Sequence, residues 1–232
     1  MFARIVKTAW PIMLSYIAVG LACGVLSAQA GMAWWMSAVL SLTIFTGSGQ
    51  FMIANLWLSG VPAASVAASV AAVSARFALY SASLAPYLKG ASKAETLAVS
   101  GTLIEEGYGI SLGKLAAGDD WGPVHATLLN VVLILTWTVA TAAGTAVGSA
   151  LSIPTAIAGF ACTSLFIYLL SSQRLSLGNA VAAVMAFIVV AAFKYVGLAN
   201  VAVPVAAVAG VAVALVVGAF ASGRGEGARD VR

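Results

Sequence analysis

Residues 61–88 read VPAASVAASVAAVSARFALYSASLAPYL, an apolar run that is long enough to cross a bilayer and is interrupted by one charge, Arg76. The next apolar run, residues 96–117, contains two adjacent carboxylates, Glu105 and Glu106. A charge at the centre of a bilayer costs roughly 2.5–3.5 kcal/mol even on lenient insertion scales. Such residues therefore face a protein interior, a partner charge or a water-filled path, and they are the first candidates for a functional site.

The composition of the whole chain is that of an integral membrane protein. Of its 232 residues, 62% are hydrophobic and 8% are charged, and the mean hydropathy is +1.05. A soluble domain carries about a quarter of charged residues, so this chain has too few to cover a surface in water. The formal net charge of +4 is modest and lies in loops and termini, which indicates membrane topology and argues against a nucleic-acid surface.

Eight apolar stretches approach the roughly 20 residues that a membrane helix needs. They are residues 8–30, 34–58, 62–88, 96–117, 124–150, 154–171, 177–193 and 198–221. The sequence predicts an all-α, polytopic transmembrane bundle with seven or eight crossings, a single permease domain over residues 1–221 and a polar tail at 222–232.

The Lys and Arg residues of the loops favour a topology with both termini on the cytoplasmic side. With eight crossings, Arg4, Lys7 and Lys114 lie inside, whereas Lys89 and Lys93 lie outside. A segment that enters and leaves on the same side would move every later loop to the opposite side.

Residues 45–51 read FTGSGQF, in the middle of the second apolar stretch. Each glycine in a helix costs about 1 kcal/mol, so the sequence predicts a broken helix near residues 46–50. Freed backbone groups at a break hold the charged ends of a substrate in many transporters, and Ser48 and Gln50 add polar side chains there. We take Gly47, Ser48, Gly49 and Gln50 as candidate substrate-binding residues; close helix packing through small residues is the alternative.

Arg76 and the two glutamates have a geometric relation. If the third and fourth stretches form a hairpin that turns near Gly90, Arg76 and Glu105 lie at the same depth and form an ion pair. Glu106 points about 100° away from Glu105 and is left to bind a cation or a proton. A static ion pair is the alternative, but nearby Ser74 and Tyr80 supply more polar groups than such a pair needs, and they join the candidates.

Enzymatic and metal chemistry receive little support from the sequence. A nucleophilic Ser48 would need a general base, and the one histidine, His125, stands at the end of another stretch. Adjacent glutamates face apart on a helix, and there is no Glu-x-x-His segment to complete a di-metal site. We therefore expect no catalytic residue, no metal and no cofactor.

Four motifs, in order along the chain, resemble those of the AzlC family of branched-chain amino acid permeases. They are FTGSGQF at residues 45–51, SARFALY at 74–80 followed by SLAP at 83–86, the pair Glu105-Glu106, and SLFI at 164–167 with Leu169-Leu170. The similarity extends from about residue 5 to about residue 220. Ser74 and Phe77 depart from the Asn and His that the family carries at these positions, which bears on substrate or coupling.

The resemblance implies a secondary-transport permease of the bacterial inner membrane that exports hydrophobic, branched-chain amino acids and is coupled to protons or another ion. It also implies a partner, a small membrane subunit of the AzlD type with about four helices. No ATP-binding motif of the Gly-x-x-x-x-Gly-Lys-Ser/Thr type is present. Two alternatives stay open: a non-transporting assembly subunit whose buried charges are structural, and a channel.

Overall fold

The computed structural model describes residues 1–151 and 177–198, together with residues 160, 163, 164, 167, 202, 205, 206, 208–210, 212 and 213. Every regular element in these residues is a helix and none is a strand, which confirms the predicted all-α class. Most of the predicted segments 154–171 and 198–221, the last of the four motifs and the whole tail 222–232 lie outside the described residues. The single permease domain over 1–221 therefore stays a prediction.

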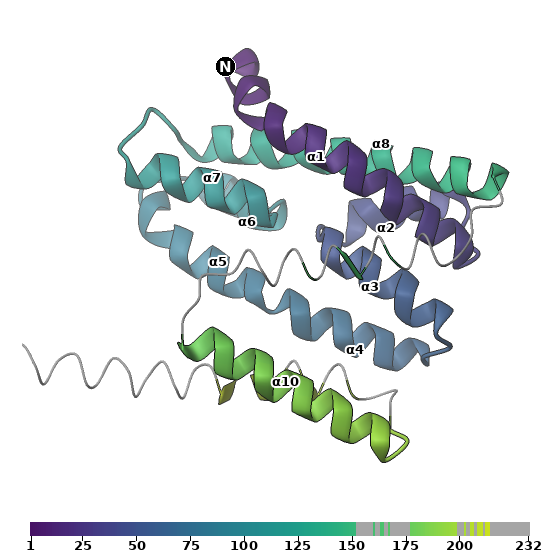
Figure 1. Ribbon diagram of the computed structural model, residues 1–232. Helices are drawn as coiled ribbons and strands as arrows, with labels where there is room; N and C mark the ends of the chain where they lie inside the picture. Colours follow the sequence, from purple (N-terminus) through teal and green to yellow (C-terminus); the bar gives the residue numbers. More distant parts are fainter. Residues whose placement is uncertain are drawn as a thin grey trace, which may run out of the picture. The chain divides into compact units, whose positions relative to one another are not determined.

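From α1 to α8 the helices follow one another through short connections (Figure 1). They are α1 (Phe2–Gln29), α2 (Trp34–Thr43), α3 (Gly47–Leu58), α4 (Ala63–Ser74), α5 (Arg76–Leu84), the 3-10 turn η1 (Ala85–Leu88), α6 (Lys93–Gly101), α7 (Glu105–Ala116), α8 (Pro123–Ala150) and α10 (Leu177–Tyr195). The chain forms two compact units, residues 1–59 with 74–164 and residues 60–73 with 165–232. In the second unit a Cβ on Gly210 would lie 3.5 Å from the carbonyl oxygen of Ala182, so the backbone there packs closely on α10.

Three helices of the described part are long and apolar enough to cross a membrane: Phe2–Gln29, Ala63–Leu88 and Pro123–Ala150. The second of these combines α4, α5 and η1. The predicted count of seven or eight crossings is thus not confirmed. The predicted stretches 34–58 and 96–117 are each divided into two short helices, for which the following contacts give the reason.

Helices α1 and α8 lie side by side and run in the same direction (Figure 1). Near the start of the pair, Arg4 forms an ion pair of 3.3 Å with Asp120, just before α8. Near its end, a Cβ on Gly24 would lie 2.2 Å from the carbonyl oxygen of Thr141. Small residues let helix backbones approach closely where no hydrophobic effect drives them together, and here they join the two longest helices.

The segment α2–α3 is a helical hairpin. Ser41 in α2 is hydrogen-bonded to Thr141 in α8, and at the tip a Cβ on Gly47 would lie 3.0 Å from the ring of Trp137. Helix α3 then turns back, since Gln50 reaches both Ser41 and, one turn earlier in α2, Ser37. Both outer ends of this hairpin, the start of α2 and the end of α3, therefore lie at the end of the unit where α1 ends.

The segment α6–α7 is a second hairpin, which enters from the opposite end. Helix α6 brings Thr102 to Asn130 of α8, and α7 then returns past the same residue, since a Cβ on Gly107 would lie 1.8 Å from the Asn130 Oδ1. Further along α7, Ser111 accepts a hydrogen bond from Trp121, at the start of α8. This hairpin therefore opens toward the end where α1 begins.

The two hairpins repeat one pattern at an interval of 58 residues. Each has a three-residue break, at residues 44–46 and 102–104, and each second helix has 12 residues, starting at Gly47 and at Glu105. Each ends before a glycine with positive φ, Gly60 at 73° and Gly118 at 72°, a conformation that glycine adopts without steric cost. A long apolar helix follows each hairpin. Because the hairpins enter from opposite ends, the repeat is inverted, an arrangement found in many secondary transporters.

The predicted break near residues 46–50 exists, but it lies at residues 44–46, just before the glycines. Gly47 and Gly49 form the first turn of α3, and the Thr46 hydroxyl caps it by accepting a hydrogen bond of 3.4 Å from the backbone N–H of Gly49. A capping Thr and small residues make a good helix start against a close neighbour, so the glycines follow the break and begin the next helix.

Candidate functional site

Arg76, the first residue of α5, joins the tips of the two hairpins. Its guanidinium forms an ion pair with Glu105, the first residue of α7, which confirms the predicted pair. The Nη2 group also donates to Ser48 in the first turn of α3, at 2.8 Å, and to the Thr46 hydroxyl at 3.4 Å. The two glutamates stand at the amino end of α7, where the helix dipole favours negative charge. One cation thus links the two opposed tips.

From the sequence, Glu106 was expected to be left without a protein partner, but the structure gives it one. It accepts a hydrogen bond from the hydroxyl of Tyr16, in the middle of α1. The Tyr16 ring contacts Trp137 of α8 edge to face, with 5.3 Å between ring centroids. Glu106 itself is exposed in this chain, so the carboxylate has room for a second partner.

Gln50 is held by hydrogen bonds to both α2 and α8. Its side chain is fully buried, and its Oε1 accepts hydrogen bonds from Ser41 at 2.9 Å and from the Trp137 indole at 2.8 Å. Its Nε2 donates to the Ser37 carbonyl and hydroxyl, both at 3.3 Å. A carboxamide has two donors and one acceptor oxygen, so this one is fully used. Gln50 fixes the first hairpin and offers no free group to a substrate.

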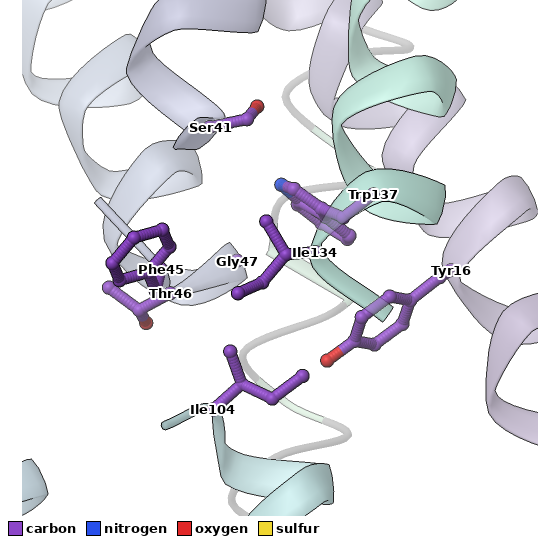
Figure 2. Close-up of a pocket in the computed structure, with 8 residues that line it drawn as sticks. All are labelled: Tyr16, Ser41, Phe45, Thr46, Gly47, Ile104, Ile134 and Trp137. Atoms are coloured by element: carbon purple, nitrogen blue, oxygen red, sulfur yellow. The ribbon is translucent and has the colours of Figure 1, made fainter. Parts of the chain in front are cut away.

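A small cavity lies between the two hairpin tips (Figure 2). Its volume is about 20 Å³, which holds about one water molecule. The first hairpin lines it through Ser41, Phe45, Thr46 and Gly47, the second through Ile104, and the long helices through Tyr16, Ile134 and Trp137. Figure 2 shows Tyr16 and Trp137 on the side opposite Phe45 and Thr46. Two of the lining residues contact charged side chains, since Thr46 accepts a hydrogen bond from Arg76 and Tyr16 donates one to Glu106.

The remaining predicted residues lie around this centre. Gly49 donates its N–H to the Thr46 cap, so it supports the tip. Tyr80 stacks on Tyr108 of α7, with 4.3 Å between ring centroids and 11° between ring planes. Ser74 is half-buried and has no hydrogen bond to the residues that the structure describes. Of the predicted set, Gly47, Ser48, Arg76, Glu105 and Glu106 are therefore brought together, whereas Ser74 is not.

Four residues around the cavity were not predicted from the sequence: Tyr16, Trp137, Ile104 and Ile134. Each stands in an apolar run in which a single aromatic or aliphatic residue carries no signal of its own. One signal in the sequence could have found Ile134. It lies 58 residues after Arg76, the interval that separates the two hairpins, and both residues lie at the level of the hairpin tips.

Two opposed re-entrant hairpins that meet beside buried charges are typical of membrane transport proteins, whose sites lie where broken helices face one another. The match to a family model agrees with that class. Residues 11–151 match the model described as AzlC protein, so the chain belongs to the AzlC family, which is associated with branched-chain amino acid transport. The matched range contains both hairpins and all the residues that line the cavity. Comparison with curated proteins and with solved structures gave no match.

Proposed function

We propose that this protein is the permease subunit of a secondary transporter that exports hydrophobic, branched-chain amino acids and is driven by an ion gradient. The observation that carries the proposal is the meeting of two hairpin tips at one half-buried cation, Arg76, with Glu105 and Glu106 at the second tip. Inverted repeats of this kind place their substrate site between the repeats and expose it to each side in turn. No step of bond making is needed, so we propose a transporter and not an enzyme.

The two tips differ in charge, and the difference suits a zwitterion. Helix α3 begins with Gly47 and Ser48, so its positive amino end carries no acidic side chain and lies next to Arg76. Backbone N–H groups at such an end, together with a guanidinium, suit a carboxylate. Helix α7 begins with two glutamates, and Glu106 faces the cavity residue Tyr16. We assign the substrate carboxylate to the first tip, and its ammonium group or the coupling proton to Glu106.

The apolar side chain of the substrate would occupy the cavity among Phe45, Ile104, Ile134 and Trp137. One methylene in such a pocket is worth only about 1–3 kcal/mol, so we expect weak discrimination among Leu, Ile, Val and Met. Since the cavity holds about one water, the described state is closed, and transport needs one tip to move away from the other.

The basic residues support an orientation with a cytoplasmic N-terminus. In residues 1–151, every Lys or Arg except Arg76 lies near the end where α1 begins: Arg4, Lys7, Lys89, Lys93 and Lys114. Lys89 and Lys93 lie at this end because the first hairpin returns toward the end of α1, and we propose the cytoplasmic side for them, in place of the outer side that eight crossings imply. Lys and Arg concentrate in cytoplasmic loops of inner-membrane proteins. We place the protein in the bacterial inner membrane, with a small four-helix subunit as its partner.

Efflux of labelled leucine from cells loaded with a leucine-containing dipeptide tests the proposal. Cells would express the chain with its small subunit, as wild type, Arg76→Ala, Glu106→Gln or Glu95→Gln. Glu95 is the matched control, because it caps α6 outside the site. We expect wild type and Glu95→Gln to accelerate efflux and the other two to stay at background. Equal efflux from all four variants would overturn the assigned roles, and flux that does not saturate with leucine would indicate a channel.

A further inference from the structure

The two hairpin tips are held by different kinds of contact. Apart from the bonds that Arg76 donates to Ser48 and Thr46, the first tip is held by neutral, buried hydrogen bonds through Gln50 and by the Trp137 ring over Gly47. The second tip packs on α8 at Asn130, and its two glutamates add ionisable contacts, Glu105 on Arg76 and Glu106 on Tyr16. A cationic ligand can compete with the present partner of a carboxylate. It finds no free group on the carboxamide of Gln50, whose oxygen and nitrogen already make hydrogen bonds. The second hairpin is therefore the one whose attachment a ligand can change.

Tyr16 is the weaker of the two partners that the glutamates of that hairpin have. Arg76 and Glu105 carry opposite full charges, whereas the Tyr16 hydroxyl is a neutral donor to Glu106. Hydrogen bonds between two charged groups are stronger than those with a neutral donor, so an ammonium group outcompetes a phenol for a carboxylate. Glu106 is exposed, so an incoming cation can reach it. Tyr16 also lines the cavity and would have to move to admit a substrate side chain (Figure 2).

We propose that Tyr16 is a positioning residue that holds Glu106, and with it the hairpin α6–α7, closed in the empty site, and that the substrate's ammonium group displaces it. Once Glu106 turns to the ammonium group, the hairpin loses its bond to α1 and can move away from the first tip. This role rests on the proposed function, since it takes the ligand to be an amino acid.

Accessibility of a cysteine at the second tip measures the opening. Ile104 is 4% exposed and lines the cavity, so Ile104→Cys, in a full chain with Cys23 and Cys162 replaced by Ala, reports when the tips separate. Ile134→Cys, on the α8 wall, gives the same reading if the first variant does not fold. The rate of maleimide labelling would be measured in liposomes with no ligand, with leucine, and with the 2-oxo acid analogue of leucine. That analogue keeps the carboxylate and the side chain but lacks the ammonium group.

In the wild-type background we expect slow labelling without ligand, faster labelling with leucine and no change with the 2-oxo acid. Tyr16→Phe removes only the hydroxyl and should speed ligand-free labelling by about tenfold, the effect of losing one hydrogen bond to a charged group. Leucine should then add little. Tyr108→Phe is the matched control: its hydroxyl accepts from Ser83, and we expect it to behave as wild type.

Unchanged ligand-free labelling in Tyr16→Phe would overturn the holding role. An equal response to leucine and to the 2-oxo acid would overturn displacement by the ammonium group. If Tyr16→Phe labels rapidly while the wild type ignores leucine and shows no efflux, the holding role is supported and the amino acid cargo of the proposed function is what fails.

Discussion

Arg76 and Glu105, 29 residues apart in sequence, form the ion pair that joins helix α5 to the tip of the second hairpin. The Arg76 side chain is 30% exposed and that of Glu105 is 25% exposed, so both charges are partly removed from solvent. The same guanidinium donates to Ser48 on the first hairpin, so Arg76 contacts both hairpin tips.

Removing Arg76 should lower both stability and transport, whereas exchanging the two charges should separate the two effects. Arg76→Ala leaves Glu105 without its partner, and we expect a loss of about 3 kcal/mol in stability together with loss of efflux. The exchanged pair Arg76→Glu with Glu105→Arg should restore most of the stability, measured by thermal unfolding in detergent. It should not restore efflux, since Ser48 and Thr46 would then face a carboxylate. Recovery of efflux in the exchanged pair would show that the charges are only structural.

The side of the membrane on which two loops lie shows whether stretch 34–58 is a re-entrant hairpin or a helix that crosses the membrane. If stretch 34–58 crossed, Ser59 would lie on the side of the N-terminus and Lys89 on the opposite side. With re-entrant hairpins the two positions are exchanged, because α3 returns toward the end of α1. We expect a membrane-impermeant maleimide, added from the side opposite the N-terminus, to label Ser59→Cys and not Lys89→Cys. Met32→Cys is the control that both arrangements place on that opposite side.

The sequence predicts the helical class, the buried charges and the Arg76–Glu105 pair because each depends on local composition or on a simple count of residues. Charge in an apolar run is visible in the sequence, and equal distances from the turn at Gly90 placed Arg76 and Glu105 at one depth. The pair formed as expected, although Glu105 reaches that depth at the start of a returning helix and not in the middle of a crossing one.

The hairpins could not be recognised from apolar length, since two short helices with a three-residue break have as many apolar residues as one crossing helix. Direction is decided by distant contacts, such as Gln50 with Ser37 and Gly107 with Asn130. The partners of Gln50 could not be predicted for the same reason. A buried amide next to glycines is compatible with a ligand site until its partners, Ser41 and Trp137, are known.

Gln50 should accordingly behave as a residue that holds the first hairpin in place. Gln50→Leu leaves the Trp137 indole N–H without its acceptor, and we expect a loss of about 1–3 kcal/mol in thermal stability. Trp137→Phe removes the donor, so the double variant should lose less than the sum of the single losses. For the fraction that folds, the concentration of leucine giving half-maximal efflux should be unchanged. A raised half-maximal concentration at normal stability would return Gln50 to the substrate site.

The amino end of α6 gives a prediction about pH, since it lies outside the membrane-embedded part of the hairpin. The pKa of Glu95 is lowered, first by the hydrogen bond that its carboxylate accepts from the backbone N–H of Ser92 and then by the bond from the Ser92 hydroxyl. A lowered pKa in the folded state means stabilisation that is present above the ordinary pKa of glutamate and lost as the pH falls through the lowered value. Ser92→Ala removes one of the two bonds and the helix cap. Its deficit in melting temperature should be largest near neutral pH and shrink below the folded-state pKa, whereas Ser92→Thr should show little deficit.

The close approach of α7 to α8 gives the sharpest test of the second hairpin. A Cβ on Gly107 would lie 1.8 Å from the Asn130 Oδ1, so Gly107→Ala should overpack the contact and cost about 1–3 kcal/mol. Asn130 is fully buried, and its Oδ1 has no hydrogen bond to the described residues, while its Nδ2 makes only a 3.5 Å bond to Thr102. Asn130→Ala alone should thus change stability little, and in combination it should relieve most of the Gly107→Ala defect. Gly109→Ala, with nothing within 4 Å of the added carbon, is the control and should be neutral or slightly stabilising. If Asn130→Ala gives no relief, α7 does not return past α8 at this residue, and the hairpin is wrong.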